Sequence, residues 1–146
     1  SNTLTDIKEA ASGINSAADK AATAISQDVH SIRAIEITHN THTFTVNDLF
    51  KSILRDVQWN YEPSQQENIL KITGTWQPNL FASYNIDETI KPDLAVNGRV
   101  TIELQVEENI IQEETTTVTL TYNEENLLNE TGQETLHYLY EYYITK

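Results

Sequence analysis

His39 and His42 are the first residues whose types and spacing could support chemistry. They lie three residues apart in a stretch expected to be a loop, and a carboxylate such as Glu36 could complete a set of Zn²⁺ ligands. The sequence lacks the helical HExxH motif of zinc enzymes, and an isolated pair of histidines at this spacing often arises by chance. We therefore predict a solvated loop without a metal ion.

A second candidate is a group of four glutamates, Glu107, Glu108, Glu113 and Glu114, which flank a predicted turn between two strands. Carboxylate oxygens are ligands that Ca²⁺ takes, but the Asp, Asn and Gly pattern of a dedicated calcium loop is absent. A pair of glycosidase carboxylates would need one buried acid. Because every glutamate falls at an exposed strand position or in a turn, we predict neither site.

The remaining catalytic motifs are missing from the sequence. The chain has no cysteine and no GxSxG motif, and its four glycines are too scattered to form a phosphate-binding loop. His137 is expected on the surface of a helix. We predict no catalytic, cofactor-binding or metal-binding residue and no cofactor, which indicates a protein that is not an enzyme.

Tyrosines near the C-terminus are better candidates for a functional role. Tyr138 and Tyr142 lie four residues apart on a predicted helix and should project away from its apolar face, which carries Leu136, Leu139 and Tyr143. Exposed tyrosine is enriched at protein interfaces. Tyr138 and Tyr142 are the predicted interface residues, with partial burial under the N-terminal helix as the alternative.

The elements that position these residues divide the chain in two. Residues 4–34 place small or apolar side chains at alternating steps of three and four, which predicts a long helix. We expect residues 1–36 to form an alanine-rich helical stalk or packing helix. Three arrangements remain open for it: packing along the rest of the chain, forming a bundle with other copies, or serving as a membrane-proximal stalk.

Residues 37–146 are predicted to form an α+β domain. We expect an antiparallel sheet of about four strands with helices on one face, preceded by the long N-terminal helix. Residues 35–43 are a short strand or a linker, Thr45 caps a short helix, and Asn97-Gly98 is predicted to form a turn. Gly74 marks a bulge or a close backbone approach within a strand. Residues 78–98 have no clean period, and a capping box at Thr131–Glu134 is predicted to begin the last helix.

The charge of the chain limits its partners. The net charge is −13, and residues 100–146 hold ten acidic residues and one basic residue. This surface disfavours nucleic acid and anionic membranes, whereas a basic protein partner would be attracted. No apolar run is long enough to span a bilayer, so we expect no direct membrane insertion.

Several segments after Thr43 resemble a C-terminal domain of bacterial envelope proteins and lipoproteins. They are TFTVNDLF (43–50), VQW (57–59), ILKITGTW (69–76), RVTIELQV (99–106) and LHYLYEYY (136–143). The resemblance implies an extracytoplasmic address, in the periplasm or at the cell surface, and no characterised activity. This chain is longer than the pattern in residues 78–98, where a function of its own would fit.

The first residues fit the same address. Ser1-Asn2 is typical of the residues that a protease leaves behind, and the chain contains no methionine. We expect that an upstream segment has been removed; a signal peptide, a lipoprotein leader or a membrane anchor would fit, and an arbitrary starting point of the chain is the alternative.

We therefore predict a non-enzymatic extracytoplasmic binding or structural module that contacts a protein partner or self-associates through its N-terminal helix. The alternative is an acidic inhibitor or immunity-type protein that masks a basic partner. A third hypothesis is a small-ligand pocket of cystatin-like or nuclear-transport-factor-like shape, which would require a deep pocket lined by Trp59, Trp76, His or Glu.

Overall fold

The computed structural model describes residues 29–63 and 68–146, of which residues 31–146 form one compact unit. Residues 4–28 of the predicted long helix lie outside the described residues, and the described residues 31–33 are helical. The compact unit contains a five-stranded antiparallel sheet, a two-stranded hairpin and helices. The predicted α+β class is therefore confirmed. Among the described residues, no helix combines the length and the apolar character that a membrane crossing requires.

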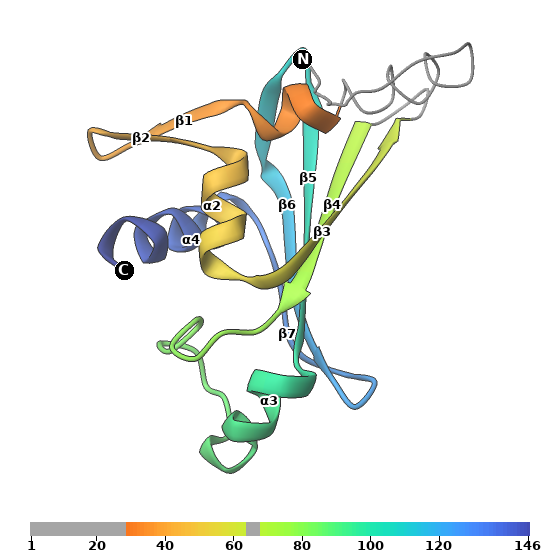
Figure 1. Cartoon of the computed structure of the whole chain (residues 1–146), viewed down its shortest axis with the longest axis vertical. Helices are drawn as coiled ribbons and strands as arrows, with labels where there is room; N and C mark the ends of the chain where they lie inside the picture. The colour runs from red at the N-terminus through yellow and green to blue at the C-terminus, as the bar shows by residue number, and fades with distance from the viewer. Residues whose placement is uncertain (1–28, 64–67) are drawn as a thin grey trace. The chain divides into compact units, whose positions relative to one another are not determined.

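Figure 1 shows the order of the elements along the chain. They are β1 (Glu36–His39), β2 (His42–Thr45), α2 (Val46–Ile53), β3 (Arg55–Pro63), β4 (Asn68–Thr75), η2 (Glu88–Ile90), α3 (Lys91–Asn97), β5 (Arg99–Glu107), β6 (Ile110–Tyr122), β7 (Glu125–Thr131) and α4 (Gln133–Thr145). Strands β1 and β2 form the hairpin, and β3 to β7 lie in sequence order in the sheet. The prediction of about four strands missed β7 and did not resolve the hairpin.

The sheet has one buried face and one partly exposed polar face. Every second residue of β5 is buried, as its alternating sequence predicted. The register extends the apolar row to the neighbouring strands, because Ile102 lies opposite Ile72 of β4 and Val118 of β6. Residues between these positions, such as Thr101, are polar and partly exposed.

Helices α2 and α4 lie on the same side of the sheet (Figure 1). The side-chain oxygen of Thr45 accepts a hydrogen bond of 3.0 Å from the backbone N–H of Asp48, which confirms the predicted N-cap of α2. The apolar face of α2 is buried, and it consists of Val46, Leu49, Phe50 and Ile53. Helix α4 contributes three more large buried side chains, Leu136, Leu139 and Tyr140. The helices and the sheet thus enclose one apolar core.

Gly74 allows the close approach that was one of its two predicted roles. A Cβ atom at this position would lie 2.8 Å from Cβ of Leu54 and 2.9 Å from the carbonyl oxygen of Arg55. The pairing of β3 with β4 is also irregular, since a bulge lies between Arg55 and Gln58 of β3. Leu54 and the start of β3 therefore lie directly against β4.

The prediction of a turn at Asn97-Gly98 was wrong. Asn97 is the last residue of α3, and Gly98 follows it with a φ of −77°. A Cβ atom on Gly98 would lie only 2.7 Å from the carbonyl oxygen of Leu94. Glycine is required here because the backbone passes close to the helix, not because a turn needs positive φ.

In the described part of the chain, the two-residue hairpin turns are formed instead by residues other than glycine. In three two-residue turns both central residues have positive φ, and these are Asn40-Thr41, Glu108-Asn109 and Asn123-Glu124. This is the backbone of a type I′ turn. The predicted capping box at residue 131 was also wrong, because Gly132 is the N-cap of α4 and no side chain caps this end.

Candidate functional site

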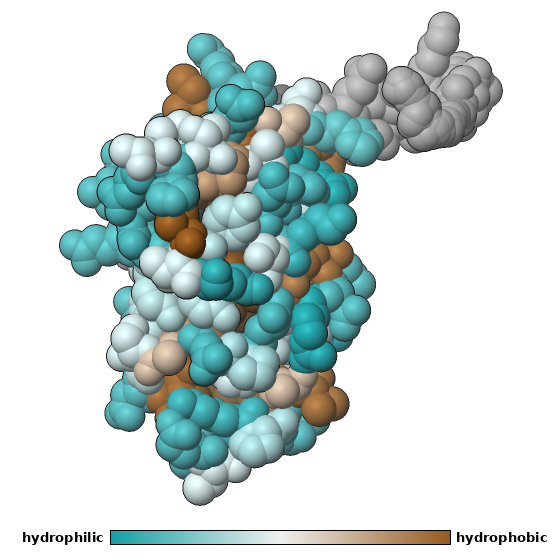
Figure 2. Space-filling view, turned by 60° about the vertical axis from the view of Figure 1, so that its left-hand side comes forward, coloured by the Kyte–Doolittle hydropathy of each residue, from teal (hydrophilic) through white to brown (hydrophobic). Residues whose placement is uncertain are grey.

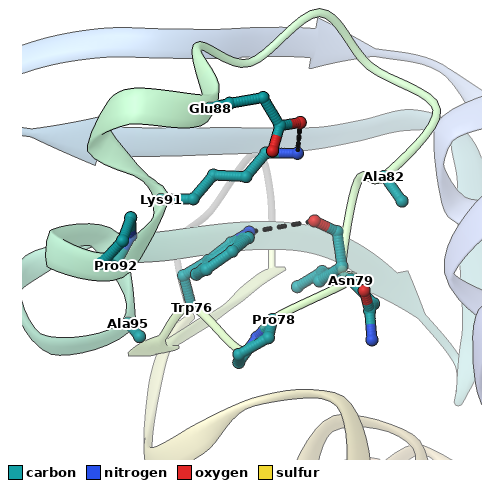
Figure 3. A pocket seen from close by; sticks show the side chains of 9 residues that line it. Trp76, Pro78, Asn79, Ala82, Glu88, Lys91, Pro92 and Ala95 are labelled. Atoms are coloured by element: carbon teal, nitrogen blue, oxygen red, sulfur yellow. Dashed lines mark hydrogen bonds and ion pairs between the residues drawn. The ribbon is translucent and has the colours of Figure 1, made fainter.

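The strongest candidate site is a pocket beside Trp76, shown in Figure 3. It has a volume of about 380 Å³ and lies between residues 76–82, which follow β4, and the helical segment of η2 and α3. Its lining residues are Trp76, Pro78, Asn79, Leu80, Ala82, Glu88, Lys91, Pro92 and Ala95. We call this the Trp76 pocket. All of its lining residues except Trp76 belong to residues 78–98, the region of the sequence without a clear period.

The first wall of the Trp76 pocket is fixed by the tryptophan itself. Trp76 is buried, and its indole Nε1 donates a hydrogen bond of 2.9 Å to the carbonyl oxygen of Leu80. Leu80 and Phe81 are fully buried. Asn79 and Phe81 have positive φ, a conformation that persists only where the surroundings hold it. Burial of Leu80 and Phe81 supplies that restraint, so this wall is a packed segment.

The second wall, formed by η2 and α3, is connected to the first by hydrogen bonds to backbone carbonyl oxygens. The N–H of Trp76 donates to the carbonyl oxygen of Gly98 at 3.1 Å. The guanidinium of Arg55 donates to the carbonyl oxygen of Ala95 and, at 3.4 Å, to that of Trp76. Pro92 lies in the first turn of α3, where a missing N–H costs no helical hydrogen bond. Both walls are therefore attached to the same end of the sheet, which fixes the distance between them.

The rim of the Trp76 pocket carries charge. Lys91 Nζ lies 2.5 Å from a carboxylate oxygen of Glu88, and the carboxylate of Glu88 is exposed. The neighbouring Asp87 accepts hydrogen bonds from the backbone N–H of Thr89 at 3.0 Å and from its hydroxyl at 2.9 Å. The backbone bond, followed by the hydroxyl bond, lowers the pKa of Asp87. Asp87 does not line the pocket itself, but it adds a negative charge at the N-terminus of η2, next to Glu88.

The predicted interface residues Tyr138 and Tyr142 lie behind the first wall. The ring of Tyr138 stacks on that of Phe81, with centroids 5.7 Å apart, and meets Tyr84 edge-on at 5.3 Å. The hydroxyl of Tyr142 donates to the carbonyl oxygen of Pro78 at 3.4 Å. Both tyrosines are partly buried, and burial is the main cause that raises the pKa of each hydroxyl. They support the wall of the pocket, and an interface role for them stays a prediction.

The two histidines that were considered as metal ligands, His39 and His42, have different surroundings. Nε2 of His39 lies 2.6 Å from a carboxylate oxygen of Glu141 on α4, and its ring centroid lies 5.2 Å from that of His137. His42 is exposed, and its Nδ1 lies 3.0 Å from the carbonyl oxygen of Asn40. The structure therefore brings His39 together with His137, a pairing that the spacing of residues 39 and 42 could not show.

Glu113 joins this histidine cluster from β6. Its carboxylate lies 2.9 Å from Nε2 of His137 and accepts a hydrogen bond of 3.1 Å from the hydroxyl of Tyr140. Burial, and next the charge of Glu113, raise the pKa of Tyr140. The expectation that every glutamate is exposed was wrong for Glu113, which is half-buried. The reason is that β6 begins at Ile110, so Glu113 lies within the strand and not beside the turn as predicted.

The carboxylates of Glu107 and Glu113, near the β5–β6 turn, form hydrogen bonds with different partners. Glu113 contacts His137 and Tyr140, whereas the carboxylate of Glu107 accepts a hydrogen bond of 3.1 Å from the side chain of Gln105. In residues 29–63 and 68–146, no three His, Asp or Glu side chains are placed to hold a metal ion. The histidine cluster is therefore a hydrogen-bonded link between the β1–β2 hairpin, β6 and α4.

Comparisons of the chain with protein-family models, with curated proteins and with solved structures found no match. The resemblance to bacterial envelope domains therefore stays a prediction.

Sequence reasoning missed most of the Trp76 pocket. Trp76 was named as a candidate pocket residue, but Pro78, Pro92 and Ala95 gave no sign that they line a pocket with it. The available signal was the position of two prolines and a tryptophan around a segment without a regular period. The structure places the two tryptophans at different pockets, because Trp59 lines a second one.

Proposed function

We propose that this chain is a non-enzymatic binding module that takes an apolar side chain of a protein partner into the Trp76 pocket. The observation that carries the proposal is the pocket itself, with its tryptophan, two prolines and two alanines. Val96, which follows the lining residue Ala95, is 73% exposed and extends the apolar surface beside the pocket. A rigid aromatic residue within a small apolar pocket is typical of a site that anchors a partner.

The charge around the pocket favours a basic residue next to the apolar anchor. Glu88 lines the pocket and has an exposed carboxylate, Asp87 precedes it in the chain, and the chain as a whole has a net charge of −13. The ion pair between Lys91 and the exposed Glu88 contributes little stability, because solvent screens it. A lysine or arginine of the partner can therefore replace Lys91 at small cost, and the acidic surface increases its rate of association.

The surface supports a local anchor better than a broad apolar interface. On the face drawn in Figure 2, hydrophobic side chains form separate patches between hydrophilic ones. Among the described residues, Val96 and Ile110 are the large hydrophobic side chains with high exposure. A partner that reads one pocket and its charged rim fits this surface.

The proposal of a non-enzymatic role rests on what lines the pocket. Its polar side chains are those of Asn79, Glu88 and Lys91, and the two charged ones neutralise each other. The nine lining residues include no Ser, Thr, Cys or His as a nucleophile or base, and their one amine, that of Lys91, is held in an ion pair with the exposed Glu88. The pocket offers shape and charge, which are the requirements of binding.

A selection from a random peptide library tests the proposal. We expect bound peptides to share an apolar residue next to lysine or arginine. Ala82→Arg places a long side chain in the pocket and should weaken binding of the selected peptides by about tenfold or more. Asn85→Arg is the matched control, because Asn85 is exposed in the same segment and does not line the pocket. Peptides that bind Ala82→Arg as well as the unchanged chain would contradict the proposal.

The location and assembly of the module remain proposals from the sequence. We place it outside the cytoplasm of a bacterium, in the periplasm or at the cell surface, with self-association through the N-terminal residues 1–36. Light scattering on the full chain and on residues 29–146, which keep the buried Ile32, tests the assembly. An oligomer that becomes a monomer on truncation supports it, and two monomers would contradict it.

The acidic inhibitor or immunity-type protein is the second candidate, because ten of the 22 acidic residues lie in residues 100–146 against one basic residue. Masking by a broad charged surface and anchoring in a pocket respond differently to salt. Affinity for a bound partner that falls steeply between low and high ionic strength favours masking. Affinity that changes little with salt but is lost in Ala82→Arg favours the Trp76 pocket.

A further inference from the structure

A second pocket lies beside the other tryptophan, Trp59. It has a volume of about 350 Å³ and shares no lining residue with the Trp76 pocket. Its lining residues come from the helical turn before β1, from the end of α2 and from β3, and they are Arg33, Lys51, Leu54, Asp56, Val57 and Trp59. We call this the Arg33 pocket.

Arg33 is held in place by a neutral partner. Its guanidinium carbon lies 4.5 Å from the ring centroid of Trp59. Its Nε and Nη2 donate to the side-chain oxygen of Asn47 at 3.0 and 2.6 Å. Burial of the half-exposed guanidinium lowers the pKa of Arg33, and no carboxylate among the described residues forms an ion pair with it. A guanidinium has five N–H donors, so this fixed cation keeps donors for another acceptor.

Lys51 supplies a second cation to the Arg33 pocket. It is exposed in the last turn of α2, and among the described residues no carboxylate pairs with it. The helix end does not need its charge, because the carbonyl oxygen of Ser52 already accepts hydrogen bonds from Gln77 and Lys146, both at 3.1 Å. The ammonium of Lys51 is therefore available to a ligand.

One carboxylate, that of Asp56, also lines the pocket. Asp56 has a φ of 53° and lies at the bulge of β3. The lining thus holds two basic residues and one acidic residue, a positive excess in a chain whose net charge is −13. Asp56 and the surrounding negative charge repel a doubly charged anion more strongly than a singly charged one.

We propose that the Arg33 pocket binds the carboxylate of a small, planar, singly charged molecule. The carboxylate contacts the free donors of Arg33 and the ammonium of Lys51, a pairing for which the planar guanidinium is suited. The apolar body of the ligand lies against Leu54, Val57 and the edge of Trp59. This site is independent of the proposed Trp76 pocket and takes a ligand of opposite charge.

Titration with benzoate, followed by NMR of the tryptophan indole N–H groups, tests this proposal. The chain has two tryptophans, so the ¹⁵N spectrum holds two indole signals, and Trp59→Phe identifies the signal of Trp59. Benzoate should shift the Trp59 signal and leave the Trp76 signal in place. Benzamide, which has the same shape without charge, should cause a much smaller shift at equal concentration.

Two variants separate charge from folding. Lys51→Gln should weaken benzoate binding about two- to fivefold, as expected for an exposed cation. Lys71→Gln is its matched control, because Lys71 is exposed on β4 and lies outside the pocket. Arg33→Gln should weaken binding about tenfold or more, provided that the spectrum keeps its dispersion.

Three results would overturn the proposal. The first is equal shifts with benzoate and benzamide, or none with either, which would show that charge does not direct binding. The second is a Lys51→Gln variant that binds benzoate as tightly as Lys71→Gln. The third is tighter binding of inorganic phosphate than of benzoate at neutral pH, which would show that the site does not prefer a singly charged carboxylate.

Discussion

The two tryptophans of this chain line pockets of similar volume, about 380 and 350 Å³, but with opposite surroundings. Trp76 is 2% exposed and uses its indole N–H to fix the neighbouring segment through Leu80. Trp59 is partly exposed, and the guanidinium of Arg33 lies over its ring. Trp76 is thus part of the core and the wall of a pocket at once, whereas Trp59 is a platform for a cation.

The comparison shows that the neighbours of a tryptophan decide what its pocket can recognise. The Trp76 pocket has two prolines, two alanines and the ion pair of Lys91 with Glu88, so it favours an apolar side chain beside a basic residue that displaces Lys91 from Glu88. The Arg33 pocket has two basic residues against one acidic residue, which favour a carboxylate. A binding module with both could hold a peptide-like partner at one place and a small acid at another.

Replacing each tryptophan with alanine gives the largest expected difference. Trp76→Ala should lower the free energy of unfolding by about 3–5 kcal/mol, because the loss of a fully buried aromatic side chain leaves a cavity. Trp59→Ala should cost roughly 1–2 kcal/mol, from a half-buried side chain and one cation–π contact. Urea denaturation followed by far-UV circular dichroism measures both values.

Equal losses of unfolding free energy in Trp76→Ala and Trp59→Ala would contradict the contrast between the two tryptophans. They would show that Trp59 is as much a part of the core as Trp76 is. Trp59→Phe is a control, since it keeps an aromatic platform under Arg33 and should cost less than Trp59→Ala.

Gly98→Ala should disturb one pocket and spare the other. The added methyl group would meet the carbonyl oxygen of Leu94 at 2.7 Å, so the end of α3 must move. We expect a loss of about 1–3 kcal/mol, the usual cost of overpacking. In the ¹⁵N spectrum the indole signal of Trp76 should shift while that of Trp59 stays in place. A shift of both signals would show that the pockets are coupled.

Ionisation of Tyr140 should destabilise the whole fold, and with it both pockets, because Tyr140 lies in the shared core and lines neither pocket. The pKa of Tyr140 is raised in the folded protein, above the ordinary value of 10.0. The contribution of its protonated hydroxyl to the free energy of unfolding is therefore fully present below pH 10.0. As the pH rises further, the unfolded state loses the proton first, and stability should fall by up to about 1.4 kcal/mol per pH unit.

Tyr140→Phe gives the matching measurement. At neutral pH it should cost about 1 kcal/mol through the lost hydrogen bond to Glu113. Above pH 10.0 its stability should fall less steeply than that of the unchanged chain. Tyr138→Phe is the control, since Tyr138 is only partly buried. Parallel pH curves for the Tyr140→Phe variant and the unchanged chain would contradict the role given to Tyr140.

The alternating and helical patterns of the sequence predicted the core of the fold. The alternation of β5 and the Thr45 cap of α2 were both confirmed, because these features depend on neighbours within one element. The turns were harder, since Asn40-Thr41 and Glu108-Asn109 adopt positive φ without glycine. At Gly98 the opposite error occurred, because a turn was predicted where none exists. Glycine is needed there because the backbone lies against Leu94, not because the local backbone has positive φ.

The sites depend on contacts between distant parts of the chain, which residue spacing does not record. His39 meets Glu141 across 102 positions, and Arg55 bonds the carbonyl of Ala95 across 40. Glu113 was predicted as exposed because it was placed beside the turn, whereas β6 begins at Ile110 and includes it. The sequence suggested Trp59 and Trp76 as pocket residues, but not that they line separate pockets with different charged neighbours.

One NMR experiment tests the central claim that the two pockets select opposite charges. The unchanged chain is titrated separately with benzoate and with benzylammonium, which have similar size and opposite charge, and the two indole signals are followed. We predict that benzoate shifts the signal of Trp59 and that benzylammonium shifts the signal of Trp76. Both probes shifting the same signal, or neither probe shifting any, would contradict the account.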